Sequence, residues 1–485
     1  MTYVAHALMR AASRLISTPR RVRHLIGSER RQEWRRGTHE CVRHVIIGLL
    51  LSTVPMLLQA QTPAPTTFLI RGADVYPGNG PVLPGASILV ENGRISEVGA
   101  NVRAPRGVRV IEARGKRVYP GLIDSGTALG LSEISQERMT VDTGELGVFM
   151  PQLRALSSVN PASEHFPVVR ANGITAAVAF PSLGGGAGAP GERQVIAGQA
   201  ALIRTDGWTW EDMAINKGGA AAMHLIFPVL TVVPSDAPPP PQPIPNAPAR
   251  TYTDGKRNYD KQIEELSEFF ENARRYKAAK AAGAPDFKAD LKFEAMLPVL
   301  DRQMPVAVTA VRERAIRDAI AFAKKQNIRI VIVGPRELGP VAAELKANDI
   351  PVIFGRTLSL PLNEDSPYDS PFTLPSEAYK AGVKFAFGTF DNQFVRDLPY
   401  DAATAVAFGL PVEEALKAIT IYPAEIWGAA AETGSIEKGK SADLIIASGD
   451  ILETPTQIEH LFIQGRDIQL SNRQTRLYER YLNRP

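Results

Sequence analysis

The chain has 485 residues, of which 44% are hydrophobic and 22% are charged, so it is long enough for one very large domain or several ordinary ones. This composition excludes a disordered or membrane-embedded body. The net charge of +4 is confined to the N-terminus: residues 1–60 hold ten Arg and no Lys against three Glu, which leaves 45 basic and 48 acidic residues beyond them. A nearly neutral body excludes the basic surface that nucleic-acid binding requires.

The N-terminal segment has the pattern of an export signal. An arginine-rich stretch leads into the apolar run VIIGLLLSTVPMLL, residues 45–58, which is too short to span a bilayer, and Leu58 and Ala60 suit a signal-peptidase site. Residues 1–60 are therefore interpreted as a secretory signal with a long basic first part, although the true start codon and an uncleaved membrane anchor stay open. The protein is expected to be exported, periplasmic or secreted, without membrane attachment after cleavage. Cys41, the only cysteine, leaves with the signal.

Alternating apolar and polar residues predict short β-strands at both ends of the remaining chain. Within residues 67–118 these are FLIRGADVYPG and GASILVENGRISEVG, where Asn92 and Gly93 are typical of a type I′ hairpin turn. Within residues 430–475 the matching stretches are GSIEKGKSADLIIASGD and QIEHLFIQGRDI. Two β segments at opposite ends of a chain predict one small β-sandwich domain, interrupted by whatever lies between them.

Residues 119–425 alternate short apolar runs with helical stretches, the pattern of repeated βα units and a parallel sheet. The candidate strands are VYPGLID, GITAAVAF, QVIAGQAALI, AAMHLIF, MPVAVTA, RIVIVG, IPVIFG and VKFAFGTF. Eight parallel strands close a TIM (β/α)8 barrel, so the predicted fold class is α/β. One helix is expected from Ile263 onward, where apolar residues keep helical spacing along one face at Leu266, Phe269, Phe270, Ala273 and Tyr276.

A proline-rich insertion, residues 234–250, interrupts this pattern and contains the sequence APPPPQPIPNAPAR, residues 237–250. Such a sequence favours an extended, polyproline-like chain. It is compatible with a spacer, a lid over the barrel mouth or an arm toward a partner, and a simple surface loop is the interpretation we favour.

Three stretches carry a family resemblance: RVYPGLID at the first barrel strand, residues 419–450 (ITIYPAEIWGAAAETGSIEKGKSADLIIASGD), and QIEHLFIQGR near the end. With them the chain resembles the amidohydrolase superfamily, in particular its imidazolonepropionase-like members. The resemblance implies a TIM barrel that carries a β-sandwich made from both chain ends, and hydrolysis of carbon–nitrogen bonds other than peptide bonds. It also implies zinc or another divalent metal at the C-terminal ends of the strands, which activates water and polarises the scissile carbonyl.

The family's metal-ligand positions hold residues without imidazole or carboxylate groups in this chain. The first strand of the family supplies two histidines with one residue between them, because alternate strand residues point into the barrel together. The vacated positions are Gly126, Ala128, Thr309, Gly334 and Phe390. Asp391 comes one residue after the last of them, where a strand side chain is expected to face the other way. No metal cofactor is therefore expected.

Beyond the signal the chain has three histidines, His165, His224 and His460. His224, on the fourth strand, is a weak metal candidate, because a catalytic zinc site uses about three protein ligands. We interpret it instead as a packed or hydrogen-bonded histidine. His165, on the helix before the second strand, and His460, in the C-terminal hairpin, are not expected to be ligands.

Polar residues nevertheless remain where the loops of the barrel mouth should gather. The candidates for a binding pocket are Asp124, Thr309, Arg356, Asp391, Asn392 and Arg396. Asp391 and Glu133 are weak candidates for a metal-free acid–base pair. We interpret the chain as an amidohydrolase-like pseudoenzyme, an oligomer that binds a small polar ligand or an intact amidohydrolase paralogue. The alternative is an active hydrolase with an unusual or metal-free site, so whether it is an enzyme stays open.

Overall fold

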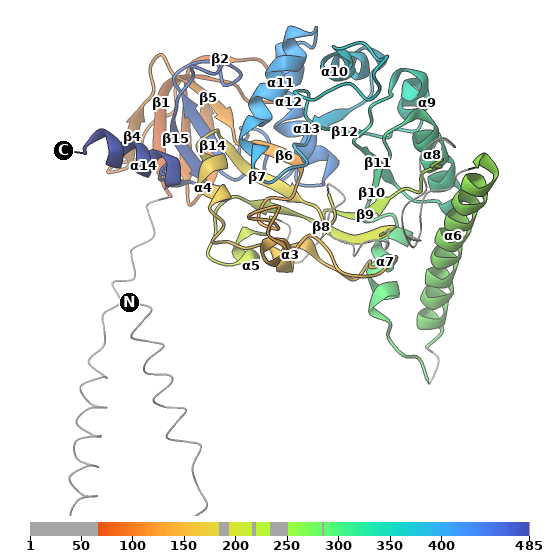
Figure 1. Ribbon diagram of the computed structural model, residues 1–485. Helices are drawn as coiled ribbons and strands as arrows, with labels where there is room; N and C mark the ends of the chain where they lie inside the picture. The colour runs from red at the N-terminus through yellow and green to blue at the C-terminus, as the bar shows by residue number, and fades with distance from the viewer. Residues whose placement is uncertain (1–65, 184–193, 216–219, 233–250, 284–285, 485) are drawn as a thin grey trace, which may run out of the picture. The chain divides into compact units, whose positions relative to one another are not determined.

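The computed structural model describes residues 66–183, 194–215, 220–232, 251–283 and 286–484 (Figure 1). The predicted signal, residues 1–60, and the proline-rich insertion, residues 234–250, lie outside the described residues. Across the described ranges no helix has the length and apolar character needed to cross a membrane.

One sheet joins the two ends of the described chain, with the strand order β16-β15-β14-β5-β1-β2-β3 and with β4 paired to β1. Its strands are β1 (Phe68–Val75), β2 (Leu83–Glu91), β3 (Arg94–Gly99), β4 (Arg109–Glu112), β5 (Arg117–Pro120), β14 (Leu444–Ala447), β15 (Ile458–Ile463) and β16 (Arg466–Ile468). Asn92 and Gly93 have φ angles of 52° and 77°, as the predicted hairpin turn requires. β5 pairs antiparallel with β14, so a sheet domain built from both chain ends is present, as predicted.

A second eight-stranded sheet forms a nearly closed barrel, with its strands in chain order (Figure 1). They are β6 (Leu122–Thr127), β7 (Ile174–Ala179), β8 (Ile196–Arg204), β9 (Ala222–Ile226), β10 (Val306–Thr309), β11 (Ile330–Val333), β12 (Val352–Phe354) and β13 (Phe385–Phe387). The first and last strands lie side by side, and Phe390 N, which follows β13, donates to Gly126 O in β6 at 2.8 Å. Each of the eight predicted segments contributes a strand to the barrel sheet, and an α/β fold with a barrel is confirmed.

Two details of the predicted barrel are wrong. β8 runs antiparallel to both β7 and β9, so the barrel is not all-parallel. Parallel neighbours need a long crossover connection, usually through a helix, and the Gly-rich sequence of residues 181–195 has no helical pattern to supply one. The segment VYPGLID is divided at Gly121, where the chain passes from the sheet domain into the barrel. A Cβ at Gly121 would lie 2.0 Å from Thr175 Oγ1, so this crossing requires glycine.

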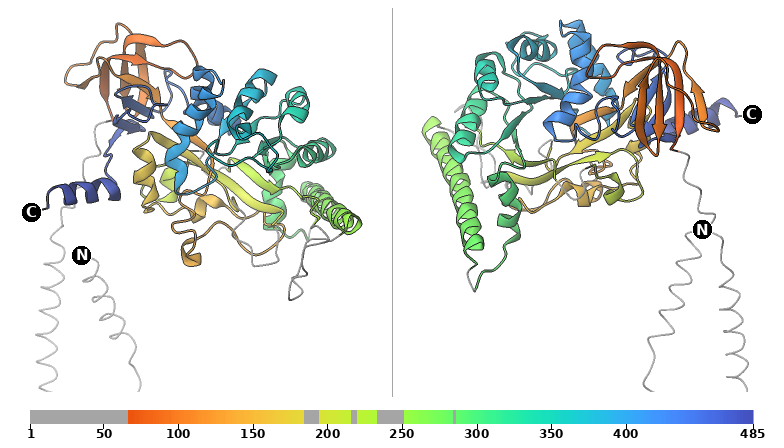
Figure 2. Two further views of the ribbon diagram at one scale, coloured as in Figure 1. Left: turned by 45° about the horizontal axis from the view of Figure 1, so that its top comes forward. Right: turned by 180° about the vertical axis from the view of Figure 1, so that it is seen from behind.

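Helices cover the outside of the barrel (Figure 2). They are α3 (Ala155–Ser158), α4 (His165–Arg170), α5 (Trp210–Met213), α6 (Tyr252–Ala282), α7 (Leu291–Leu300), α8 (Glu313–Gln326), α9 (Ala342–Ala347), α10 (Ser370–Ala381), α11 (Leu398–Ala407), α12 (Val412–Ala418) and α13 (Ile421–Ile426), with α14 (Arg473–Leu482) at the C-terminus and the short 3-10 helices η1 (Arg138–Thr140), η2 (Gly339–Val341) and η3 (Phe394–Asp397). α6 buries Leu266, Phe270 and Ala273, so the predicted apolar face of this helix is confirmed.

Candidate functional site

The aromatic ring of Phe390 is surrounded by glycine positions at the barrel mouth. Phe390 follows β13 with a φ of 54°, a left-handed backbone conformation that is uncommon for a large residue. A Cβ would lie 2.7 Å from the ring at Gly126, 2.9 Å at Gly388, 3.2 Å at Gly355 and 3.5 Å at Gly334. These positions lie at the ends of β6, β13, β12 and β11. We call the four of them the glycine cradle.

The glycine cradle includes two of the vacated ligand positions, Gly126 and Gly334. Position 126 faces the ring, because an added Cβ there would meet both Phe390 and, at 3.8 Å, Phe180. A histidine at 126 would therefore need the space that the ring of Phe390 occupies. The mouth lacks metal donors at these positions, and an apolar ring fills the space beside them.

His224 is buried and both of its ring nitrogens have partners. Nδ1 lies 2.6 Å from Pro181 O, and Nε2 lies 2.8 Å from the hydroxyl of Thr309. Since a carbonyl only accepts, Nδ1–H donates to Pro181 and Nε2 accepts from Thr309. Burial lowers the pKa of His224 to about 4, so the ring is neutral near pH 7. The lone pair that could bind a metal is already engaged.

Asp124 is fully buried at the place where β6 meets β13. Its Oδ1 accepts from Gly126 N at 2.9 Å and from Thr389 N at 3.1 Å, and its Oδ2 accepts from Thr389 Oγ1 at 2.5 Å. Burial raises the pKa of Asp124 to about 7, although these three hydrogen bonds act in the opposite direction. Asp124 therefore joins the first and last strands of the barrel and does not face the mouth as a free carboxylate.

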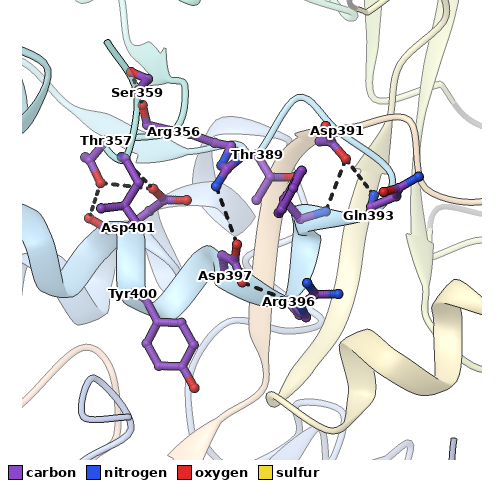
Figure 3. A network of polar contacts seen from close by, with 12 residues as sticks. Arg356, Thr357, Ser359, Thr389, Asp391, Gln393, Arg396, Asp397, Tyr400 and Asp401 are labelled. Carbon is purple, nitrogen blue, oxygen red and sulfur yellow. Dashed lines mark hydrogen bonds and ion pairs between the residues drawn. The ribbon is translucent and has the colours of Figure 1, made fainter. Parts of the chain in front are cut away.

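The two arginines of the predicted pocket share one acidic partner (Figure 3). Arg356 lies 3.4 Å and Arg396 3.7 Å from the carboxylate of Asp397, a residue that the sequence analysis did not single out. The guanidinium carbon of Arg356 also lies 4.2 Å from the ring centroid of Phe394, within the range of a cation–π contact. These charges are thus partly satisfied within the protein.

Asp391 and Asn392 hold the loop that follows β13. Asp391 Oδ1 accepts from the backbone N–H groups of Gln393 at 2.6 Å and Phe394 at 3.1 Å, so its carboxylate orders the start of η3 (Figure 3). Asn392 Nδ2 donates to Ser132 O at 2.8 Å and ties this loop to the one after β6. The positions of both side chains are therefore explained by the loops that they hold in place.

Glu133 lies beside His165, and not beside Asp391. His165 Nε2 is 2.9 Å from Glu133 O and 3.8 Å from Glu133 Oε2, while Glu133 Oε1 is buried without a hydrogen-bond partner. Among the described residues no hydrogen bond or ion pair joins Glu133 to Asp391, the pairing considered for metal-free catalysis. His460, on β15 outside the barrel, lies 3.2 Å from Asp467.

A zinc site does not fit these residues. In the ranges that the structure describes, no three His, Cys, Asp or Glu side chains gather closely enough to hold a metal ion. The vacated positions supply no imidazole or carboxylate, and His224 uses both nitrogens internally. No step of a metal-assisted reaction can be assigned to these groups.

Sequence reasoning did not identify the role of Phe390 as a space-filling ring, although a signal was present. Each of the last three barrel strands is followed directly by glycine, in the stretches VIVG, VIFG and FAFG. A glycine repeated at strand ends indicates close approach of another group. Asp401, on α11, was also missed; its Oδ1 accepts from Thr357 Oγ1 at 3.0 Å and from Leu358 N at 3.2 Å, which fastens the loop after β12.

Comparison with known proteins agrees with this architecture. The model of the amidohydrolase family matches residues 320–468, from α8 through the last barrel strands to β16. This match covers less than a third of the 485 residues. The matched residues include the glycine cradle positions 334, 355 and 388, but not the first barrel strand.

Solved structures with a similar fold cover most of the chain. An amidohydrolase from Thermotoga maritima is 24% identical over 83% of this chain and 99% of its own, with a TM-score of 0.69. A further amidohydrolase (18% identity, 83% and 98% coverage, TM-score 0.49) and a Xaa-Pro dipeptidase with bound methionine in the active site (16%, 83% and 100%, 0.48) are also similar. No match was found among curated proteins.

Proposed function

We propose that this amidohydrolase-family chain is a non-catalytic subunit that binds a partner protein through its barrel mouth. The observation that carries the proposal is the ring of Phe390 in the glycine cradle, at the place where the family binds its metal. A ligand set is absent from the vacated positions, and the remaining imidazole, His224, is bonded to Thr309 and Pro181. Fold alone does not imply activity, so the site decides the interpretation.

Large apolar side chains are exposed on the loops around the mouth. They follow β6, β9, β12 and β13, whose C-terminal ends lie at this end of the barrel. The exposed residues are Ile134, Met139, Leu146, Val148, Val229, Val232, Leu358, Leu360, Tyr368 and Phe394. Apolar side chains gathered on one face of a soluble protein favour an interaction with another protein. A small polar ligand is a weaker proposal than a protein partner, because the charges of Arg356 and Arg396 are already partly paired within the protein.

The proposal predicts that the purified protein retains no stoichiometric zinc after dialysis, because positions 126, 128, 309, 334 and 390 offer no imidazole or carboxylate. Elemental analysis measures this directly, with a catalytically intact amidohydrolase treated in parallel as the control. Hydantoin, imidazolone and acyl-dipeptide substrates should show no turnover that a chelator abolishes. About one tightly bound zinc per chain, together with chelator-sensitive turnover, would show that the chain is an active metal-dependent hydrolase.

The partner we propose is an intact amidohydrolase paralogue from the same genome, and binding to it tests the mouth. Met139→Glu combined with Leu360→Glu should weaken binding at least tenfold, since a buried charge in an apolar contact costs more than 1.4 kcal/mol. Trp208→Glu is the matched control. Trp208 and Met139 are both 91% exposed, but Trp208 follows the antiparallel strand β8 and so lies at the other end of the barrel. Equal binding by both variants, measured by calorimetry, would remove the mouth as the interface.

A further inference from the structure

The C-terminal helix α14 (Arg473–Leu482) forms without burying any of its residues. Asn472 and Thr475 make a reciprocal capping box, in which each side chain accepts from the backbone N–H of the other. The helix is therefore started by local hydrogen bonds and not by packing. Figure 2 shows it at the C-terminal end of the blue ribbon, projecting from the sheet domain.

The two sides of α14 differ in chemistry. At 100° per residue, Leu477, Tyr481, Tyr478 and Leu482 fall on one side of the helix, and all four are between 38% and 68% exposed. Gln474 lies within this side. Arg473 and Arg480 lie along one of its edges, Glu479, the only acidic residue of the helix, lies beyond the other edge, and Arg476 lies opposite. Arg476 lies 3.6 Å from Glu164, while no ion pair within the described residues engages Arg473 or Arg480.

We propose that α14 is an interfacial helix that binds an anionic phospholipid surface, which departs from the expectation of no membrane attachment after signal cleavage. Its apolar side would enter the boundary between headgroups and acyl chains, and the flanking arginines would contact lipid phosphates. Tyrosine favours this boundary because its ring is apolar and its hydroxyl remains hydrated. Glu479 lies beyond the edge away from these arginines and would stay in water.

A helix-to-helix contact with a second copy fits these residues less well. The four exposed apolar side chains offer on the order of 500 Å² per chain, judged from the size of Tyr and Leu. A stable protein interface buries about 800 Å² on each partner. A lipid surface needs no such area, because electrostatic attraction to anionic headgroups adds to apolar burial. The charge and the limited area together favour the membrane.

Vesicle flotation tests the proposal with the protein from Gln61 onward, since Ala64–Pro485 forms a compact unit of its own without the apolar run. Vesicles of phosphatidylcholine with 30% phosphatidylglycerol should carry the protein, and pure phosphatidylcholine should carry at least tenfold less. Tyr481→Glu with Leu482→Glu should reduce binding to the anionic vesicles at least tenfold. Arg473→Gln with Arg480→Gln should remove most of the salt-sensitive part of that binding.

Leu291→Glu on α7 is the matched control, because Leu291 is as exposed as the apolar residues of α14 and lies on another element; it should bind as the wild type does. Light scattering on the same samples measures the oligomeric state. The lipid assignment would be overturned if the wild type did not float, or if it bound both kinds of vesicle equally. It would also be overturned if the α14 variants changed the oligomeric state and left flotation unchanged. None of these results bears on zinc content or on the barrel mouth, so this proposal and the proposed function can fail separately.

Discussion

Phe390→Ala is expected to lower the free energy of unfolding by about 3 kcal/mol, because removing a packed aromatic ring leaves a cavity among the cradle glycines. Phe390→Gly removes the same ring but should cost about 1 kcal/mol less. The backbone of Phe390 has a φ of 54°, which glycine adopts without strain and alanine does not. Urea unfolding of the two variants separates the ring's packing from the backbone's strain.

The contact between the ring and the cradle has a sharper test in a double-mutant cycle. Gly126→Ala alone should destabilise the protein by about 1–3 kcal/mol, since its Cβ would meet Phe390 Cε1 at 2.7 Å. Once Phe390 is alanine, the same change should cost little, so the two substitutions should couple by at least about 1 kcal/mol. Gly99→Ala is the control and should add independently to Phe390→Ala, because nothing lies within 4 Å of a Cβ at Gly99. Additive effects at 126 would show that the ring does not occupy the cradle.

This cycle also bears on the proposed function. If the ring and position 126 do not compete for space, the vacated ligand positions are only empty, and a ligand could enter beside them. If they do compete, restoring a histidine at 126 would destabilise the fold before it could create a metal site. The glycine at position 126 and the ring of Phe390 are then two parts of one arrangement.

Local pattern was enough to predict the strands, the hairpin at Asn92 and Gly93, and the buried side of α6. It was not enough for the direction of β8, because direction depends on how the chain returns across the barrel and not on the strand's own residues. The division of VYPGLID at Gly121 was missed for a similar reason. Both halves are apolar and extended, and only the approach of Thr175, distant in sequence, separates them.

The candidate site shows the same limit. The absence of donors at Gly126 and Gly334 is visible in the sequence, since glycine has no side chain. The group that fills the space is not visible in the sequence, because the ring of Phe390 reaches positions that lie far before it in the chain. The guanidinium groups of Arg356 and Arg396 are paired with Asp397, and that of Arg356 also contacts the ring of Phe394. Both partners lie on a short 3-10 helix, and only the fold places this helix near the end of β12.

Asp124→Ala should be among the most destabilising single changes in the barrel, at about 3–5 kcal/mol. It leaves the N–H groups of Gly126 and Thr389 and the hydroxyl of Thr389 buried without an acceptor at the junction of β6 and β13. Asp124→Asn should be mild near pH 4. Its carbonyl oxygen can accept from both N–H groups, and its amide can donate to the hydroxyl of Thr389.

The two substitutions also predict a pH dependence. The pKa of Asp124 is raised from 3.8 to about 7 in the folded protein, mainly by burial, so the folded state holds this proton more tightly than the unfolded state. The stability that results is fully present below about pH 4 and is lost as the pH rises through 7, to a total of at most about 4 kcal/mol at 1.36 kcal/mol per pKa unit. Asp124→Asn cannot ionise, so its advantage over the wild type should grow from near zero at pH 4 to a few kcal/mol at pH 8. Urea midpoints of both proteins across this pH range measure the difference in their stability. The contributions of Asp401 and the other titrating groups are common to both proteins and largely cancel. Parallel curves would mean that Asp124 is ionised in the folded protein throughout, held by its three donors against the cost of burial.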